Sequence, residues 1–468
     1  MFLLRYFVLR LPVCMGTKKI VVLGGGESGV GAALLAQAKG FDVFLSDKGK
    51  LGDSYRATLQ QAGIPFEEEQ HTDSQILTAS EVIKSPGIPA TVPLIKALRQ
   101  RGTPIVSEIE FAARYTNARL IGITGSNGKT TTSLLTYHLL KTAGFNVGLA
   151  GNIGDSFAEQ VLNQSYDYYV LELSSFQLDD MYDTHLDVRV LLNITPDHLD
   201  RYNYDFQQYV DSKFRILQNV RADDTFIYFD GSQPVTDQLA KQAYAIQQRP
   251  IRLDGELTGE GGYALNGQLT ARTGTQTFTI AQADTPLRGP HNAINMLAAV
   301  LVAQAVGATD EVIANGLRTF ENAAHRLEPV GTINGVQFIN DSKATNVDSV
   351  FYALSSMDTP TVWIAGGQDK GNDYSQLDAL VSKYVKALIC LGVDNKKLVA
   401  HFGERVPVLY ETQQIADAVA KGLSLAGPGE TVLLSPACSS FDLFRNYIDR
   451  GDQFRTAVAQ LADAVIIP

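Results

Sequence analysis

The feature that most constrains the fold of this chain is a regular alternation of short β-branched runs with longer helical patterns. Runs such as 19–23, 119–124 and 361–365 are mostly apolar, and a polar or glycine-rich turn follows each of them. Strands that are apolar on both faces and separated by helices form parallel sheets covered by helices. We therefore expect an α/β protein.

The alternation falls into three blocks, as expected for 468 residues at about 100–200 residues per domain. We expect a Rossmann-like domain over 1–107, a central P-loop domain over 108–321 and a Rossmann-like domain over 322–468. Each is expected to contain a mostly parallel, doubly wound sheet. Within the second block, the Gly- and Thr-rich segment 255–279 predicts a small antiparallel excursion.

The ends and the composition exclude several classes of protein. Residues 1–14 are too short to span a bilayer, and we interpret them as an extension that precedes a folded chain starting at Met15. A net charge of -11 argues against non-specific nucleic-acid binding. Cys14, Cys390 and Cys438 form no CxxC pair, so no disulfide framework or zinc site is expected. We expect a cytoplasmic protein without a membrane partner.

The strongest local signal is Gly-Ile-Thr-Gly-Ser-Asn-Gly-Lys-Thr-Thr at 122–131, between an expected strand and an expected helix. Glycines let phosphate approach backbone N–H groups, and the helix start adds a positive end. Lys129 can reach the β- and γ-phosphates, and the Thr130 hydroxyl can hold Mg²⁺. Ile123 breaks the strict Walker A spacing, but the strand–loop–helix context disfavours a chance turn. The predicted phosphate site comprises Gly125, Asn127, Gly128, Lys129, Thr130 and Thr131.

A second glycine-rich turn, Gly24–Gly31, follows the first expected strand, and Asp47 lies about 20 residues further on. This pattern resembles a dinucleotide fingerprint, in which the acid would bind a ribose. The alternative is a βα turn that uses glycine only for tight packing. Glu27 is unfavourable beside a pyrophosphate, which counts against NAD.

Polar side chains follow two further expected strands of the second block. Glu172 lies near the end of 168–173, and His198 follows 188–193. Ligands of open α/β sheets bind at this edge, so both side chains could serve Mg²⁺, although histidine would be an unusual ligand. The alternatives are a buried, satisfied acid and a histidine that caps a turn. The default interpretation of Lys213, on a helical segment with an apolar stripe, is a solvated face.

Further candidates lie near the end of the second block. Asn292 and Asn295 open an apolar helix and could read a base or simply cap the helix. Arg326, at the boundary with the third block, could clamp a γ-phosphate or lie on the surface.

Three loops in the third block follow expected strands, at 341–346, 366–370 and 435–442. They bring hydroxyls and cations to one edge of a parallel sheet. That combination suits a small dicarboxylate, and the alternative is a set of unrelated capping residues.

From about Lys18 to the C-terminus these motifs resemble the Mur ligases of peptidoglycan synthesis. The superfamily motifs are GxTGxNGKTT, the Glu172 segment, NxTxDHLDR and GxHNxxN. Asp-Ser-Lys-Ala-Thr-Asn at 341–346 and Ser-Pro-Ala-Cys-Ser-Ser-Phe-Asp at 435–442 resemble the branch that adds D-glutamate. The resemblance implies a monomeric, ATP-dependent ligase that joins D-glutamate to UDP-N-acetylmuramoyl-L-alanine through an acyl-phosphate.

The resemblance also implies residue roles. Lys129, Glu172, His198 and Lys213 would be catalytic, and Lys213 would be carbamylated, giving an anionic ligand for one of two Mg²⁺ ions. ATP contacts would come from Asn292, Asn295, Arg326 and Asp341. The UDP substrate would contact Ser28, Asp47, Asn152 and Ser174. The D-glutamate pocket would comprise Lys343, Thr345, Lys370, Ser440, Phe441 and Tyr447.

Three rival hypotheses stay open at this point. The chain could be an oxidoreductase that reads a dinucleotide with its first block, which leaves the phosphate loop at 122–131 and the acids around it without a role. It could be a P-loop switch that hydrolyses nucleotide without amino-acid dependence. Within the family, it could add a different amino acid.

Overall fold

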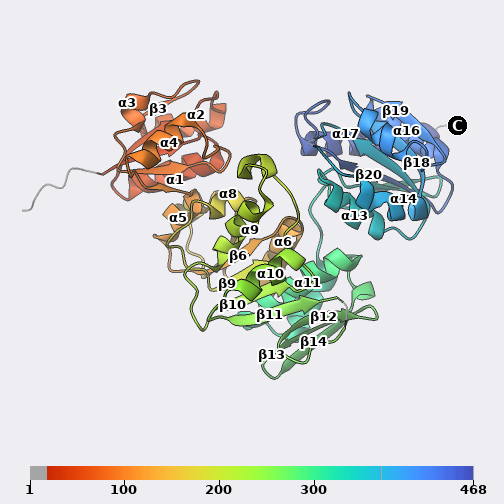
Figure 1. The fold of residues 1–468 in the computed structure, drawn as a ribbon, viewed down its shortest axis with the longest axis horizontal. Helices are drawn as coiled ribbons and strands as arrows, with labels where there is room; N and C mark the ends of the chain where they lie inside the picture. The colour runs from red at the N-terminus through yellow and green to blue at the C-terminus, as the bar shows by residue number, and fades with distance from the viewer. Residues whose placement is uncertain (1–17, 254, 370, 467–468) are drawn as a thin grey trace, which may run out of the picture. The chain divides into compact units, whose positions relative to one another are not determined.

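The computed structural model describes residues 18–253, 255–369 and 371–466. The expected extension at 1–14, Met15 and the predicted substrate residue Lys370 lie outside this part of the chain. The described residues form three separate sheets, each with helices (Figure 1). The expected α/β class with mostly parallel sheets is confirmed.

The first sheet is parallel throughout, with the strand order β3-β2-β1-β4-β5. Its strands are β1 (Lys19–Leu23), β2 (Asp42–Ser46), β3 (Phe66–Glu67), β4 (Glu81–Lys84) and β5 (Ile105–Val106). Its helices are α1 (Glu27–Ala38), α2 (Asp53–Ala62), α3 (Asp73–Ile76), α4 (Pro93–Gln100) and α5 (Glu108–Ala113). The first strand leads directly into the predicted glycine-rich turn. The short strands β3 and β5 were not expected from the sequence.

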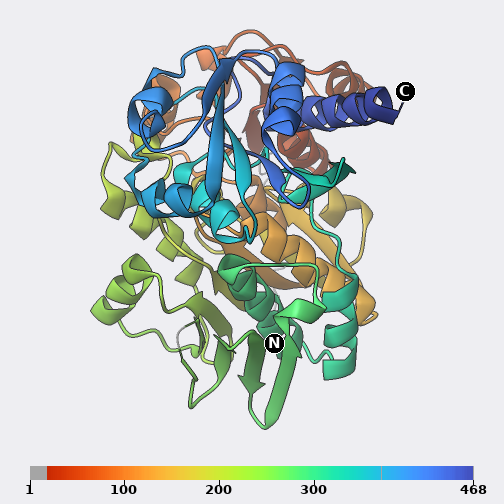
Figure 2. The same ribbon diagram turned by 90° about the vertical axis from the view of Figure 1, so that its right-hand side faces the viewer.

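The central sheet has the order β14-β13-β12-β11-β10-β9-β6-β8-β7. Its strands are β6 (Arg119–Thr124), β7 (Val147–Gly151), β8 (Tyr168–Glu172), β9 (Val188–Leu191), β10 (Thr225–Phe229), β11 (Gln247–Arg252), β12 (Gly261–Leu265), β13 (Gln268–Thr273) and β14 (Gln276–Ala281). The run from β8 through β6, β9, β10 and β11 to β12 pairs in parallel. Strands β12, β13 and β14 form antiparallel hairpins, as the Gly- and Thr-rich segment predicts (Figure 2).

The helices in this part of the chain lie between the central strands in sequence or follow them. They are α6 (Lys129–Thr142), α7 (Phe157–Asn163), α8 (Ser175–Leu178), α9 (Phe206–Phe214), α10 (Gln233–Lys241), α11 (Pro290–Ala305) and α12 (Asp310–Thr319), with 3-10 turns η1 (Leu199–Tyr202), η2 (Arg215–Leu217) and η3 (Gln282–Asp284). Helix α11 is buried along most of its length and packs against α6 and several central strands. A helix that is apolar all round is buried in this way.

The third sheet has the order β15-β16-β20-β17-β18-β19, and only β15 runs antiparallel to its neighbour. Its strands are β15 (Glu328–Ile333), β16 (Val336–Asn340), β17 (Thr361–Gly366), β18 (Val385–Leu391), β19 (Leu409–Thr412) and β20 (Thr431–Ala437). Its helices are α13 (Val347–Ser355), η4 (Ser375–Leu377), α14 (Asp378–Tyr384), α15 (Lys396–Phe402), α16 (Ile415–Leu425) and α17 (Tyr447–Ile466). Helix α17 is the dark blue helix that ends at the mark C in Figure 2.

Strand β17 shows why this third sheet is doubly wound. Trp363 and Ala365 belong to one hydrophobic core, whereas Val362 and Ile364 belong to another. Successive strand residues point to opposite faces, so the two cores lie on the two faces of the sheet. Both faces are therefore covered, which is the burial that parallel strands require.

The described residues group into two compact units. The first contains 18–118, 148–167 and 174–185, and the second contains 119–147, 168–173 and 186–466. The boundaries predicted at 107/108 and 321/322 stay predictions. No helix in the described part of the chain combines the length and apolarity needed to cross a bilayer.

Candidate functional site

The predicted phosphate loop joins the carboxyl end of β6 to the start of α6. Gly128 is the N-cap residue of α6 and has a φ of +85°, which favours glycine. A Cβ at this position would also lie 2.4 Å from Oδ1 of Asn295. Glycine is therefore required here on both counts, and the loop places backbone N–H groups at the positive end of α6.

Lys129 folds back over this loop. Its Nζ donates hydrogen bonds to the carbonyl oxygens of Gly125 at 2.8 Å and Ser126 at 2.9 Å. Burial lowers the pKa of the Lys129 ammonium, although the carboxylates of Glu172 and Asp197 act in the opposite direction. Both of these hydrogen bonds from Nζ end on neutral carbonyls, which a phosphate can replace with stronger, charge-assisted bonds.

Lys213 is buried with 1% of its surface exposed, so the default interpretation of a solvated face is wrong. Its Nζ donates to Gly125 O at 2.9 Å, the same oxygen that accepts from Lys129. It also lies 4.8 Å from the centre of the Tyr209 ring. Tyr209 and Lys213 are four residues apart on α9 and share its inner face. The hydroxyl of Tyr209 in turn lies 3.0 Å from Ser126 Oγ in the phosphate loop.

The predicted metal ligands come from three neighbouring strand ends. Glu172 ends β8 with 1% of its surface exposed, and Thr130 lies in the first turn of α6. His198 has a φ of +52°, and its Nε2 lies 3.6 Å from Asp197 Oδ2. Across 18–253, 255–369 and 371–466, no cluster of three His, Cys, Asp or Glu side chains could hold a metal. The oxygen donors of Thr130 and Glu172 suit Mg²⁺, but the site needs another anionic ligand.

A cavity in the second unit lies between the phosphate loop, α11 and the segment 322–353. Two buried polar atoms on its wall, Nδ1 of His291 and Nδ2 of Asn127, have no hydrogen-bond partner among the described residues. Burial lowers the pKa of His291 to about 4, so this imidazole is neutral. Because buried polar atoms are normally satisfied, the wall is suited to a polar ligand.

Asn292 and Asn295 lie on the cavity side of α11 and are both buried. Nδ2 of Asn295 donates to Oδ1 of Asn292 at 3.1 Å, and Oδ1 of Asn295 lies 3.2 Å from the Thr132 hydroxyl on α6. Asn295 therefore links α11 to α6, whereas Nδ2 of Asn292 donates to the Arg288 carbonyl at 2.8 Å, just before α11 begins.

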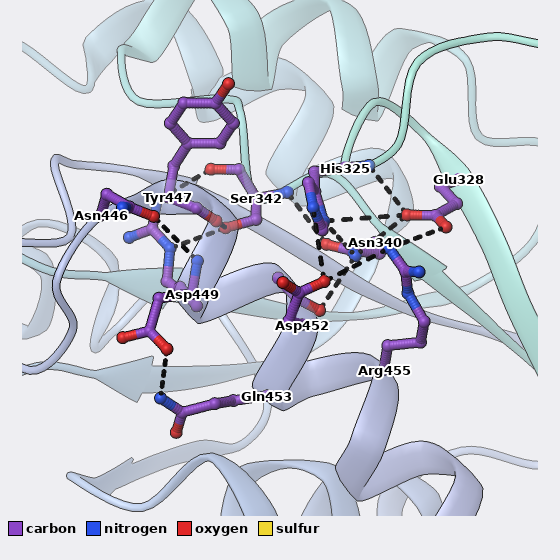
Figure 3. Close-up of polar contacts among 12 residues, drawn as sticks. His325, Glu328, Asn340, Ser342, Asn446, Tyr447, Asp449, Asp452, Gln453 and Arg455 are labelled. Atoms are coloured by element: carbon purple, nitrogen blue, oxygen red, sulfur yellow. Dashed lines mark hydrogen bonds and ion pairs between the residues drawn. The ribbon is translucent and has the colours of Figure 1, made fainter. Parts of the chain in front are cut away.

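Arg326 reaches the phosphate loop from the segment between α12 and β15. Its guanidinium donates to Oγ1 of Thr130 at 3.0 Å, and the side chain is half-buried. The flanking residues His325 and Leu327 have φ values of +64° and +43°. Figure 3 shows His325 beside Asn340, Glu328 and Asp452, and its Nδ1 lies 3.0 Å from Nδ2 of Asn340.

Asp341 follows β16 and is buried at the same cavity. Its carboxylate accepts hydrogen bonds from the Ser435 hydroxyl at 2.8 Å and from the backbone N–H of Leu327 at 3.2 Å. Burial raises the pKa of Asp341 to about 7, against these hydrogen bonds and the charge of Arg326. The carboxylate thus ties the Arg326 segment to the third sheet.

The structure brings together only some of the residues predicted to bind the amino-acid substrate. Nζ of Lys343 lies 3.7 Å from the centre of the Tyr447 ring, and burial lowers the pKa of Lys343 to about 8. Ser440 is buried, whereas Phe441 is 66% exposed. The backbone N–H of Thr345 donates to Lys343 O at 2.9 Å, which folds this loop tightly.

The first unit contains the residues predicted to contact the UDP substrate. Asp47 accepts hydrogen bonds from the backbone N–H groups of Gly25 at 2.5 Å and Gly49 at 2.6 Å. Glu27 accepts one from Ser156 N at 3.2 Å, which gives this unfavourable acid a role outside phosphate binding. Ser174 caps α8 through a capping box with Gln177. Ser28 lies in the first turn of α1, and Asn152 directly follows β7.

Two residues near the site escaped sequence reasoning. Tyr209 counted only as part of an apolar stripe, although its spacing to Lys213 was a usable signal. Arg450 lies on α17, shortly after the 435–442 motif but outside it, and its buried guanidinium contacts the end of β17 and the loops after β16 and β20. No local pattern marks such a residue.

Comparisons with known proteins cover nearly the whole described chain. Residues 18–107 match the Mur ligase MurD-like N-terminal domain, residues 123–303 the Mur ligase middle domain and residues 325–438 the Mur ligase glutamate ligase domain. The UDP-N-acetylmuramoylalanine--D-glutamate ligase of Bacteroides fragilis is 51% identical over 95% of this chain and 100% of its own length. The enzyme of the same name from Christiangramia forsetii is 49% identical over 95% of this chain and 100% of its own length.

Solved structures share the fold at low sequence identity. A pseudomurein peptide ligase type C from Methanothermus fervidus aligns with a TM-score of 0.62 at 18% identity, over 95% of this chain and 100% of that one. MurF from Acinetobacter baumannii aligns with a TM-score of 0.61 at 17% identity, over 95% and 93%. Taken with the domain matches and the close relatives, this chain belongs to the Mur ligase family.

Proposed function

We propose that this chain joins D-glutamate to UDP-N-acetylmuramoyl-L-alanine at the expense of ATP, through an acyl-phosphate. The names of relatives at about half identity describe D-glutamate ligation, and those relatives match over their full length. The structural observation that supports the proposal is one cavity with the phosphate loop on one wall and Arg326 and Asp341 on the other.

A free carboxylate is a poor electrophile. Transfer of the γ-phosphoryl group to it gives an acyl-phosphate and ADP; the amine then attacks the carbonyl carbon and phosphate leaves. Lys129 and Arg326 are placed to stabilise the charge on the transferred group, because both contact the loop that would hold it. No covalent enzyme intermediate is needed.

Magnesium fits this site in the proposed function if Lys213 is modified. When bound, Mg²⁺ neutralises phosphate charge, and Thr130, Glu172 and His198 would hold up to two ions with a carbamylated Lys213. As an ammonium, Lys213 places a second cation on Gly125 O beside Lys129. A carbamate would replace that charge with anionic oxygen.

Further residues would bind the substrates. We assign D-glutamate to the loops of the third sheet, with Lys343, Thr345, Ser440, Phe441 and Tyr447, together with Lys370. We assign the UDP group to the glycine-rich turn Gly24–Gly31, with Ser28 and Asp47, and further substrate contacts to Asn152 and Ser174. Asn292 and Asn295 would face the adenine side of ATP.

One chain carries residues for every substrate, so we propose a monomer. We place it in the cytoplasm, because the reaction consumes ATP and a nucleotide-linked substrate.

Phosphate release from ATP and Mg²⁺ with UDP-N-acetylmuramoyl-L-alanine tests the proposal when single amino acids are added. Release that depends on D-glutamate and not on L-glutamate is expected. Release with a different amino acid would keep the ligase but change the pocket assignment. Release without dependence on either substrate would sink the ligase and favour a P-loop switch.

A further inference from the structure

Arg450 is a buried cation that the proposed mechanism leaves unused. It lies in the first turn of α17, and 1% of its surface is exposed. Its guanidinium makes five hydrogen bonds with other described residues, of 2.9–3.4 Å. A buried arginine of this kind needs a reason, because isolated charges are costly to bury.

The acceptors of these bonds come from three separate loops. Nε donates to Oγ of Ser342 and Nη2 to the Ser342 carbonyl, in the loop after β16. Nη1 donates to Gly366 O at the end of β17, where the loop 366–370 begins, and both Nη atoms donate to Cys438 O after β20. These are the loops that the sequence marks as suited to a small dicarboxylate. One planar, five-donor group therefore fixes the spacing of all three.

The start of α17 closes the same arrangement from its own side. The hydroxyl of Ser342 donates to the carbonyl oxygen of Tyr447 at 2.8 Å, and Figure 3 shows the two residues side by side. Tyr447 holds its ring against the ammonium of Lys343. Arg450 and Ser342 thus set the position of two residues assigned to the amino-acid pocket.

The charge of Arg450 is incompletely matched. All five of its hydrogen bonds within the described residues end on carbonyl or hydroxyl oxygens, none on a carboxylate. Asp341 and Asp442 act on it only through space, and burial lowers its pKa to about 10, so it stays charged at neutral pH. Lys343, on the loop after β16, is a second cation on this side of the third sheet, and a pair of cations suits a dianionic substrate.

We propose that Arg450 is a positioning residue for the amino-acid substrate: it ties the three strand-end loops into one pocket and supplies it with buried positive charge. The inference rests on the proposed function, since it assumes that these loops bind D-glutamate. It does not place Arg450 in contact with the substrate.

The test compares two buried arginines of the same protein. Arg189, on β9, is equally buried and donates to Asp224 and to the carbonyls of Ile216, Gln218 and Asn219, away from the three loops. R450K and R189K each keep a charge but lose the planar fork. KM for D-glutamate and for ATP, kcat and the thermal midpoint are measured for both, beside the unmodified chain.

R450K is expected to raise KM for D-glutamate about tenfold or more while KM for ATP stays within about twofold. R189K should lower the thermal midpoint without changing KM for D-glutamate. An unchanged KM in R450K, or an equal rise in R189K, would overturn the proposal. If R450K does not fold, S342A decides: it removes the hydroxyl that contacts Arg450 and Tyr447, and it should raise the same KM about threefold or more. An unchanged KM in S342A would also overturn the proposal.

Hydroxylamine separates this inference from the proposed function. It can replace the amino acid as nucleophile and convert an acyl-phosphate into a hydroxamate, without using the pocket. At a D-glutamate concentration near the KM of the unmodified chain, R450K should keep hydroxylamine-dependent phosphate release and lower only D-glutamate-dependent release. Equal loss of both would contradict a pocket role. If the unmodified chain forms no hydroxamate, the reaction does not pass through an acyl-phosphate. The proposed function would then fail, and so would the inference that rests on it.

Discussion

The phosphate loop of the central sheet and the three loops of the third sheet both follow the carboxyl ends of parallel strands, but they are held in different ways. The phosphate loop is one continuous segment. Lys129 bonds to Gly125 and Ser126 within it, and α6 begins directly after it. The third-sheet loops lie far apart in the chain, and Arg450 joins them from a fourth element.

The difference suggests two ways to build a binding site. In the phosphate loop, glycine conformation and the helix start fix the geometry locally, so each residue of the loop can contact the phosphates itself. In the third sheet, geometry depends on a buried cation that contacts no substrate in our proposal. Substitutions should therefore act on chemistry at the first site and on affinity and pH dependence at the second.

The largest effect is expected at Lys129. K129M removes the ammonium that contacts Gly125 and Ser126, and with it charge stabilisation of the transferred phosphoryl group. We expect kcat to fall about 100- to 1,000-fold with little change in the thermal midpoint. Steady-state phosphate release measures it, with K141M, in the last turn of the same helix, as control. A loss below about tenfold would mean that the loop is not the chemical centre.

An intermediate effect is expected in the pH dependence of KM for D-glutamate. The pKa of Lys343 is lowered to about 8, so this side chain is charged below pH 8 and neutral above it. A neutral amine attracts a carboxylate poorly, so KM for D-glutamate should rise as pH increases beyond about 8, by about tenfold per unit at most. KM for ATP should not follow it.

K343R provides the comparison, because a guanidinium stays charged over this range. Its KM for D-glutamate should be flatter with pH than that of the unmodified chain, and titration of the substrate amine affects both proteins equally. Parallel pH profiles for the two proteins would show that Lys343 does not bind the substrate as a cation.

The contrast between the two sites also explains what sequence could predict. The phosphate loop, β6 and α6 were predictable because strand, glycines, lysine and helix are adjacent in the chain. The buried state of Lys213 was not, since a lysine on an amphipathic helix is ordinarily solvated and only the tertiary fold turns α9 inward. Arg450 was not predictable either, because its partners are separated from it by up to 108 residues.

The smallest effect is expected where the two sites meet, at Gly451. A Cβ on this residue would lie 2.2 Å from Nδ1 of His325, so the ring that packs on α17 has to move. His325 precedes Arg326, whose guanidinium contacts Thr130 in the phosphate loop. Helical Gly→Ala changes ordinarily stabilise by about 0.5–1 kcal/mol, so a lower thermal midpoint in G451A would report this clash.

If α17 seats the Arg326 segment, G451A should raise KM for ATP about threefold and leave KM for D-glutamate within about twofold. The double variant G451A/H325N shortens the side chain that clashes and should recover much of the thermal midpoint lost in G451A. KM for ATP should recover less, because the shorter asparagine side chain would not fill the space of the His325 ring between Asn340 and Asp452 (Figure 3). A normal KM for ATP in G451A would mean that the Arg326 segment keeps its position without this contact, and the two sites would then be organised independently.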